Sequence, residues 1–502
     1  MNTLNASAAD STAASTSAST SASTPASSPA QQGSTRTVDA ARQVQQTAQQ
    51  ALQLMRAQGF EHAQVSVSSL RRSEVCLAHN EASLLRSTAG YRLQLVGLLD
   101  GRRAASEASS IDSQSLQNTV QELWVNVASA PQDAANAVSA DQQLQHVRGL
   151  PTGNGSAHDE SSENDTLAQT MADLLAWRQQ HTPEVMLEDA LAGHNHQHAC
   201  VLTSGGSELL TDQRWYDAQV FGLAREGSTA GRAGGEAGGK SVGKTGGHTG
   251  GNTGGRSSSF NFAGGNADTL LGQPIEQRFG IGSMMQALVR QIDARPMGAR
   301  FQGAVVLTPP AVASLLGWLL GQLADQALID GSSVYRQRVG QSVTSAALTL
   351  KSRFDAPGVA PLSADGFVAA PVELISNGRL NLLTPSLYGS RKTGLPHVPL
   401  AGQGWDMAAG SRPLAELIAA VPRGALVDRL SMGRPSANGD FSGVIKNSFA
   451  IEGGQPGHAL SETMISGNVA QMLSDVQAAS RERIDTGGWV LPWLLVPGLH
   501  FS

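Results

Sequence analysis

The chain has 502 residues, 40% of them hydrophobic, which is enough for two or more packed units. Its 35 Lys and Arg residues against 41 Asp and Glu residues give a formal net charge of -6. A broad basic surface for nucleic-acid binding is therefore not expected. The two cysteines, Cys76 and Cys200, are too few and too far apart for a disulfide framework, which favours a reducing, cytoplasmic location.

The N-terminal segment is rich in Ser, Thr and Ala. It lacks the basic start and apolar core of a targeting sequence, so we expect a disordered tail over residues 1–36. No stretch reaches the roughly 18 uninterrupted apolar residues that a membrane helix needs. The nearest, residues 312–328, is interrupted by Asp325 and by several Gly and Gln residues. We therefore expect no membrane contact.

The next segment predicts an α+β unit. From Val38 to Met55 apolar residues recur at helical spacing, and Gly59 is placed to end the helix. A second helix is expected after Ser113. Between the two helices the period changes to two, with a turn at Asp100-Gly101. This alternation predicts antiparallel strands over residues 63–67, 75–78 and 91–99.

A polar, poorly periodic stretch follows, which predicts a linker near residues 130–185 with a short helix around 167–175. Strands are expected again at residues 200–202 and 215–223. These elements complete an N-terminal α+β domain over residues 37–225.

Residues 226–258 are Gly/Ser/Thr repeats, which predict a disordered insertion at the tip of a hairpin that resumes at Phe260. Two overlapping segments, 234–241 and 238–245, fit the phosphate-binding pattern G-x-x-x-x-G-K-[ST]. A working P-loop needs a buried strand before it and a helix after it. The repeats supply neither, so nucleotide binding is not expected.

Residues 259–502 contain a central segment and a sheet-rich C-terminal domain. Short apolar runs such as 366–370, 372–375 and 425–430 are punctuated by Gly, Pro and Asn, as in strands at hairpin spacing. The strand 305–307 leads through Pro309-Pro310 into an apolar helix. Two further helices are expected over residues 414–421 and 469–479. A sheet of this kind has open edges, which suit pairing with a partner or an extended peptide.

Three histidines, His194, His196 and His198, alternate along a strand with Cys200 in the same phase. Imidazole and thiolate are good zinc ligands, but ligands in one extended line do not close a tetrahedron without help from elsewhere. A solvent-facing or adventitious metal-binding run is therefore favoured, and a metal site built on the three histidines is the alternative. Cys200 beside His198 does not have the spacing of a thiol nucleophile.

None of the twelve histidines is followed by Glu, so the chain has neither His-Glu-x-x-His nor His-Glu-x-x-x-His. Those helical motifs place two imidazoles and a glutamate around a zinc-bound water. Without them, and without a G-x-S-x-G nucleophile elbow, the sequence specifies no catalytic residue.

Several C-terminal motifs occur in the order typical of the TldD/PmbA family of peptidases, which the chain resembles over about residues 38–502 outside the Gly-rich insertion. In that family one kind of subunit carries a zinc-binding His-Glu-x-x-x-His helix, and the PmbA or TldE kind lacks it. The segment 303–322 stands where the ligand helix would be, and it is apolar. The motifs are Ile-Asp-Gly-Ser-Ser-Val-Tyr-Arg at 329–336, Leu-Tyr-Gly-Ser-Arg-Lys-Thr-Gly at 387–394, Gly-Asp-Phe-Ser at 439–442, Ala-Leu-Ser-Glu-Thr-Met-Ile-Ser-Gly-Asn at 459–468 and the final strand at 489–499.

The resemblance implies a non-catalytic, PmbA/TldE-like subunit with an N-terminal helix and antiparallel strands followed by a sheet-rich C-terminal domain. It implies a TldD-like zinc peptidase as partner, with the zinc in that partner, and unfolded peptides such as leader segments as substrates. Peptide or partner contacts are candidates at Asp440, Phe441, Ser442 and Glu462, but a structural role is favoured first: ordinary turn chemistry for 438–442 and a solvated strand face for Glu462.

Two alternatives stay open. The chain is itself a metallopeptidase that uses His194, His196 and His198, or it is a regulatory binding protein without a role in proteolysis.

Overall fold

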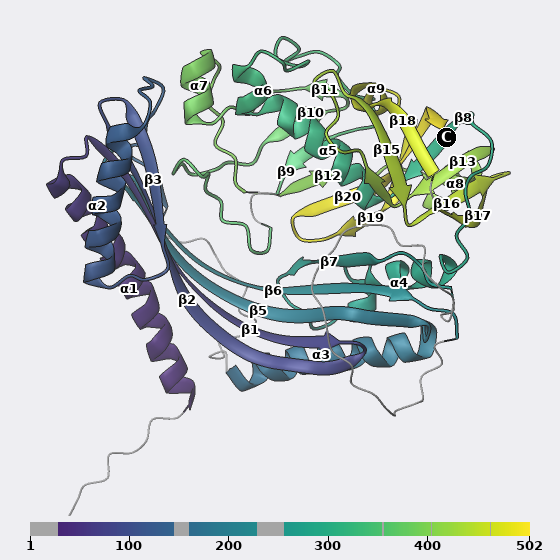
Figure 1. Cartoon of the computed structure of the whole chain (residues 1–502), viewed down its shortest axis with the longest axis horizontal. Coiled ribbons are helices and arrows are strands. Elements are labelled where there is room, and N and C mark those ends of the chain that lie inside the picture. Colours follow the sequence, from purple (N-terminus) through teal and green to yellow (C-terminus); the bar gives the residue numbers. More distant parts are fainter. Residues whose placement is uncertain (1–28, 145–159, 228–255, 354–355, 403, 462) are drawn as a thin grey trace, which may run out of the picture.

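The computed structural model describes residues 29–144, 160–227, 256–353, 356–402, 404–461 and 463–502. As predicted, the fold is α+β. A curved N-terminal sheet holds the C-terminal domain against its concave side, and helices cover its convex side (Figure 1). Within the described residues, no helix is long and apolar enough to cross a membrane.

The N-terminal sheet has the order β3-β2-β1-β5-β6-β4, with β7 paired to β6. The alternation predicted as short strands belongs to strands of 17 to 19 residues, because the long antiparallel pairs continue past the alternating runs, with register shifts at Cys76/Leu77 and Leu187/Asp189. The turn at Asp100-Gly101 is confirmed, with positive φ at both residues. The strands are β1 His62–Ala78, β2 Glu81–Leu99, β3 Arg102–Ala108, β4 Gln143–Leu144, β5 Val185–Thr203, β6 Glu208–Ala224 and β7 Asn261–Ala267.

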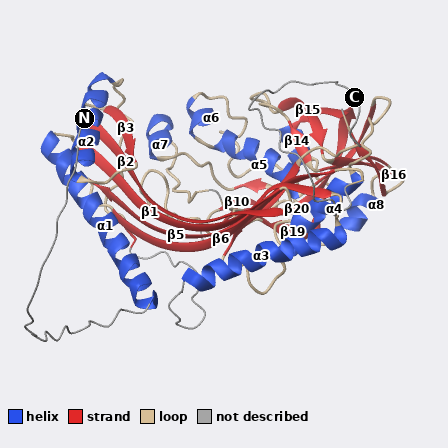
Figure 2. Ribbon diagram, turned by 60° about the horizontal axis from the view of Figure 1, so that its bottom comes forward, coloured by secondary structure: helices blue, strands red, loops and turns tan. Residues whose placement is uncertain are grey.

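Helices α1 (Pro29–Gln58) and α3 (Glu160–His181) lie along the convex face of this sheet (Figure 2). Helix α1 ends before Gly59 as predicted, but it begins at Pro29, so residues 29–36 of the expected tail are helical. Residues 1–28 and the P-loop-like matches lie outside the described part of the chain.

The expected linker contains a helix of 22 residues, α3, in place of the short helix that was predicted. Leu167, Met171 and Leu174 pack into the core beneath the sheet, while most of the other α3 residues are polar. Contact with the sheet stabilises this weakly amphipathic helix, and its own sequence pattern gives little indication of its length. Helices α2 (Ser113–Ser129) and α4 (Ile281–Arg290) also pack on the sheet.

The C-terminal sheet has 13 strands, with the main order β11-β10-β9-β12-β20-β8-β13-β16-β17. Strands β14, β15 and β18 extend from β20 in a second branch, and β19 also pairs with β20. The strands are β8 Phe301–Leu307, β9 Leu350–Ser352, β10 Glu373–Ser376, β11 Arg379–Leu380, β12 Trp405–Met407, β13 Arg423–Val427, β14 Arg429–Ser431, β15 Asp440–Lys446, β16 Ser448–Glu452, β17 Gln455–Leu460, β18 Thr463–Asn468, β19 Ala478–Asp485 and β20 Trp489–Phe501.

Three local predictions in this domain are wrong in detail. The run 366–370 forms no strand, and the run 425–430 is split into β13 and β14 at Asp428. The helix expected over 469–479 ends at Ser474, and β19 begins at Ala478. The helices of this half are α5 Pro309–Leu323, α6 Asp325–Ile329, α7 Leu387–Thr393, α8 Leu414–Ala419 and α9 Val469–Ser474, with a 3-10 turn, η2, at Ile275–Gln277.

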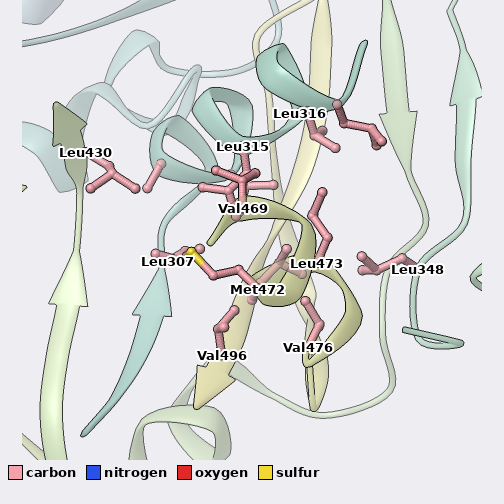
Figure 3. Packing of buried hydrophobic residues seen from close by; sticks show 14 of the residues in the cluster. Leu307, Leu315, Leu316, Leu348, Leu430, Val469, Met472, Leu473, Val476 and Val496 are labelled. Carbon is pink, nitrogen blue, oxygen red and sulfur yellow. The ribbon is translucent and has the colours of Figure 1, made fainter. Parts of the chain in front are cut away.

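The largest hydrophobic cluster surrounds α5. Figure 3 shows Leu315 of α5 beside Val469 of α9, with Met472 and Leu473 of α9 below, and all four are buried. Because α5 is packed between α9 and strands β8 and β20, its first turn has a fixed position. That turn faces the junction between the two sheets.

Polar contacts dock the domains at both ends of the concave face. Beside the concave face, Gln213 Nε2 donates to the carbonyl oxygen of Val359 (2.8 Å). At the other end, Tyr388 and Lys392 of α7 both bind Asp133, with Tyr388 Oη at 2.8 Å and Lys392 Nζ at 2.6 Å from Asp133 Oδ2.

Candidate functional site

A cleft of about 800 Å³ opens where the two sheets meet. Strands β6 and β7 and helix α4 form one wall, and the first turn of α5, β13, β14 and β20 form the other. A neighbouring hollow of about 660 Å³ shares Phe279, Gly280, Ile484 and Trp493 with the cleft. The two hollows therefore form one groove along the domain junction, which is a common place for binding sites.

A polar network that joins both domains lines this cleft. Asp428 lies between β13 and β14, where Thr308 Oγ1 donates to Asp428 Oδ1 (3.0 Å) and Asn261 Nδ2 donates to Asp428 Oδ2 (2.9 Å). Arg429 Nε donates to Asn261 Oδ1 (3.0 Å) and lies 3.7 Å from Asp428 Oδ2. Asn261, from the N-terminal sheet, thus connects an acid and a base of the C-terminal sheet.

The ionisation of Asp428 and Arg429 reflects their partial burial. Desolvation raises the pKa of the Asp428 carboxyl, and the Arg429 charge and the two hydrogen bonds oppose this shift. Desolvation likewise lowers the pKa of Arg429, and Asp428 opposes that shift. Each group therefore favours the charged form of the other.

Exposed aromatic side chains lie at the edge of the cleft. Phe221 and Phe262 line it and face each other across the β6–β7 pair. Phe260 stacks on Phe221 with ring centroids 5.0 Å apart, and Arg429 Cζ lies 3.8 Å from the centre of the Phe262 ring. Phe262 is 56% exposed. Grouped exposed aromatics of this kind mark a surface that binds apolar groups.

The first turn of α5 offers the cleft no metal ligand. Its first two residues, Pro309 and Pro310, lack backbone N–H groups, and the helix contains no His, Cys, Asp or Glu. Asp189 and Asp428 are the acidic residues that line the cleft among the described residues, and no His or Cys joins them. Both oxygens of Asp428 are hydrogen-bonded beside the Arg429 cation. A zinc ion does not fit this donor set.

The residues predicted from the sequence as contact residues lie on β15, outside the cleft. Asp440 accepts hydrogen bonds from Asn438 Nδ2 (2.9 Å) and Asn468 Nδ2 (2.8 Å), which hold the turn before the strand and lower the Asp440 pKa. Phe441 is buried in the core around α5, and Ser442 is exposed. These contacts give Asp440 and Phe441 structural roles, and a role in peptide or partner contact stays a prediction. Glu462 lies outside the described residues.

The three histidines of β5 do not converge. His194 Nδ1 is 3.0 Å from Glu163 Oε2, and its ring packs against Tyr216. His196 and His198 instead approach Asp212 of β6. Cys200 is fully buried in the apolar core beside α1, and burial raises the pKa of its thiol to about 12. A thiol with that pKa is not a nucleophile at neutral pH.

Sequence reasoning missed Asp428, Arg429 and Asn261. The run 425–430 has the composition of one strand, although its two adjacent opposite charges, Asp428 and Arg429, indicate an interruption. The sequence pattern indicates only that a strand resumes at Phe260. The exposure of Phe260 and Phe262 depends on the pairing of β7 with β6, which the sequence alone does not give.

Comparison with known proteins gives the following relationships. Residues 302–502 match the family model described as the PmbA/TldA metallopeptidase C-terminal domain. No curated protein matches the chain in sequence. TldE from Thermococcus kodakarensis has a similar structure, with a TM-score of 0.70 and 17% identity over 91% of this chain and 100% of that chain.

Two further solved structures are similar, and both are named as proposed modulators of DNA gyrase. The protein from Bacteroides thetaiotaomicron has a TM-score of 0.73 and 19% identity over 91% of this chain and 98% of that chain. The protein from Thermotoga maritima has a TM-score of 0.67 and 13% identity over 91% and 100%. At these identities the likeness establishes a shared fold.

Proposed function

We propose that this chain, whose residues 302–502 match the C-terminal domain model of the PmbA/TldA metallopeptidases, is the non-catalytic, PmbA/TldE-like subunit of a peptidase assembly. In this assembly the chain binds and orients an unfolded peptide, and a TldD-like partner supplies the zinc and the hydrolytic water.

The composition of α5 carries this proposal. In the zinc-bearing subunits the family resemblance places a His-Glu-x-x-x-His motif on the helix that follows this strand. Here the same place has Pro309-Pro310 and apolar residues, and the adjoining cleft has no His or Cys among its described lining residues. Peptide hydrolysis at this cleft therefore requires a metal centre from another chain.

The cleft itself supports peptide binding. The exposed rings of Phe221 and Phe262 suit the apolar side chains of an unfolded substrate, and Trp489 and Trp493 line the groove further along. Arg429 supplies a positive charge beside the Phe262 ring, where peptide carbonyl or carboxylate oxygens could be bound. Leader-type segments, which are extended and partly apolar, match this combination.

An open strand edge supports the proposal that this chain assembles with a partner. Strand β3 pairs with β2 only from Leu93 onward, so within the described residues the outer edge of β2 has no strand partner from Glu81 to Arg92. Leu84 and Leu85 are exposed there, and Leu85 reaches 60% exposure. Long exposed edges are normally covered, which favours an assembly in which another chain pairs here. The two free cysteines support a reducing, cytoplasmic setting for it.

Co-expression with the His-Glu-x-x-x-His protein of the same source tests the proposal. We expect one complex in size-exclusion chromatography with light scattering, zinc at the stoichiometry of the partner, and peptidase activity that needs both chains. In that complex Phe262→Ala should raise KM for an unfolded peptide about fivefold, because an aromatic contact of this kind contributes about 1 kcal/mol.

Full peptidase activity of the partner alone, unchanged on adding this chain, would contradict the proposal. Activity of this chain alone would instead favour the metallopeptidase alternative. Stable association without any effect on hydrolysis would favour a regulatory binding protein.

A further inference from the structure

A polar strip crosses the convex face of the N-terminal sheet, between two separate apolar clusters. One cluster packs under α1 and contains Cys200, and the other packs under α3 and contains Ala192. Between them on β5 lie His194, His196 and His198. None of these histidines lines the cleft at the domain junction, so the strip is a separate feature.

Strand register brings an acid to two of the histidines. In the antiparallel β5–β6 pair His198 lies opposite Asp212, and His196 lies opposite Arg214. Asp212 Oδ1 is 2.8 Å from His196 Nε2 and 3.5 Å from His198 Nδ1. The three ligand atoms all lie within 4.8 Å of one another.

We propose that His196, His198 and Asp212 form a site for a divalent transition-metal ion of the zinc type. Imidazole nitrogen and carboxylate oxygen are the donors that such ions take in three-ligand protein sites. Tetrahedral zinc with bonds of about 2.1 Å holds its ligand atoms about 3.4 Å apart, close to the His198–Asp212 distance. The His196–Asp212 contact of 2.8 Å is shorter than this spacing and has to open, and the ligand nitrogens of His196 and His198, which lie within 4.8 Å of each other, have to reach the same spacing.

The burial of the three side chains fits an ion that enters from one side. His196 and His198 are 3% and 8% exposed, so the sheet and its neighbours restrict both rings, whereas Asp212 is 49% exposed. The carboxylate thus lies at the solvent side of the site, where water can supply the fourth ligand. The ion would link β5 to β6 through side chains.

Nearby charge sets the strength of this site. Two arginines oppose a cation: Arg214 from β6 and Arg71 from β1, both opposite His196. Glu163 of α3 lies 3.7 Å from Arg71 and offsets part of its charge. We therefore expect a moderate affinity for the metal ion, and we expect the positive charge of Arg214 to weaken binding most.

Cobalt(II) titration of the tag-free, full-length chain, monitored by visible absorption and reversed with zinc, tests the site. We expect one ion per chain with the strong bands of four-coordinate cobalt. Asp212→Asn and His198→Gln should each weaken binding by about 100-fold. His194→Gln, two residues away on the same strand, is the matched control and should leave binding unchanged.

Arg214→Gln separates a metal site from a purely structural network. Removing this positive charge should tighten cobalt binding by about tenfold, whereas a network without a metal role predicts no such gain. Binding that is unaffected by Asp212→Asn, or lost equally with His194→Gln, overturns the proposal. If His198→Gln fails to fold, Asp212→Asn still decides, because Asp212 is half exposed. The titration needs no peptidase partner, so its result is independent of the proposed function.

Discussion

The two sheets of this chain differ in how they bury their faces. The C-terminal sheet packs around α5 and α9 in one large apolar cluster. The N-terminal sheet has two smaller clusters, under α1 and under α3, with charged and polar side chains between them and on its concave face. We infer that the C-terminal sheet provides most of the stability of the chain, and that the N-terminal sheet provides surfaces that can bind ions, strands or ligands.

The largest effect should come from the C-terminal cluster. Leu315→Ala removes a fully buried side chain of α5 and leaves a cavity against Val469, so unfolding should become about 3 kcal/mol easier in a chemical denaturation experiment. Val125→Ala, at an exposed apolar position of α2, is the control and should change the free energy of unfolding by less than about 0.5 kcal/mol. Equal effects of the two changes would mean that the cluster around α5 does not provide the stability inferred for it.

A smaller loss of stability is expected from a substitution in the charged network on the concave face of the N-terminal sheet. The Arg72 guanidinium donates to both oxygens of Asp217 (2.6 and 2.9 Å), to Asn195 Oδ1 (2.8 Å) and to Glu74 Oε2 (2.6 Å). Arg72→Met leaves the Asp217 carboxylate without its main partner, which should cost about 2 kcal/mol of unfolding free energy.

Arg92→Met is the matched control for that change. Arg92 pairs with Glu107 on the surface, where both side chains are more than half exposed, so its loss should cost less than about 1 kcal/mol. The double change Arg72→Met with Asp217→Leu should recover part of the stability. A cost for Arg92→Met as large as that for Arg72→Met would mean that burial of the network is unimportant.

A weaker, pH-dependent effect is expected where α7 docks on the N-terminal domain. The Lys392 ammonium, with the Ala135 N–H and the Tyr388 hydroxyl, lowers the pKa of Asp133 to about 2. Because the folded-state pKa lies below the unfolded value of about 3.9, this stabilisation is present above pH 4 and is lost as the pH falls toward 2. The protection of the α7 amides, taken relative to their intrinsic exchange rates at each pH, should therefore decrease between pH 4 and pH 2, and Asp133→Asn should remove that decrease. Protection of α7 that does not change with pH in this range contradicts the assignment.

The smallest effect on stability is expected from a substitution at the open outer edge of β2. Leu85→Lys on β2 should alter the thermal midpoint by less than about 1 °C, because Leu85 is exposed. It should nevertheless weaken association with the zinc-bearing partner by about tenfold, since a charge at a strand edge opposes pairing. Leu271→Lys, at an exposed leucine elsewhere, is the control for added charge. Equal affinity of the two variants for the partner would exclude this edge from the interface.

The sequence predicted elements whose determinants are local. The helix from Val38, the Asp100-Gly101 turn and the strand before Pro309-Pro310 all follow from spacing, Gly and Pro. The length of α3 could not be predicted, because packing on the sheet decides it. Part of the His196–His198–Asp212 cluster could have been predicted from the sequence. The tight turn at Gly205-Gly206 fixes the register that places Asp212 opposite His198.

The cleft could not be predicted from local pattern. Its central contact joins Asn261 to Asp428, 167 residues apart, and neither residue stands in a recognisable motif. Such a pairing depends on how two separately packed sheets dock. The same holds for Tyr388 and Asp133, which lie 255 residues apart.

The position of Asn261 has a consequence for the order of folding. Asn261 belongs to β7 of the N-terminal sheet, whereas Asp428 and Arg429 border β13 and β14 of the C-terminal sheet. Each sheet has its own apolar core and can form before the other is complete. The network in the cleft is then the last part of the chain to assemble, and a ligand that binds there stabilises only molecules in which both halves have folded and docked.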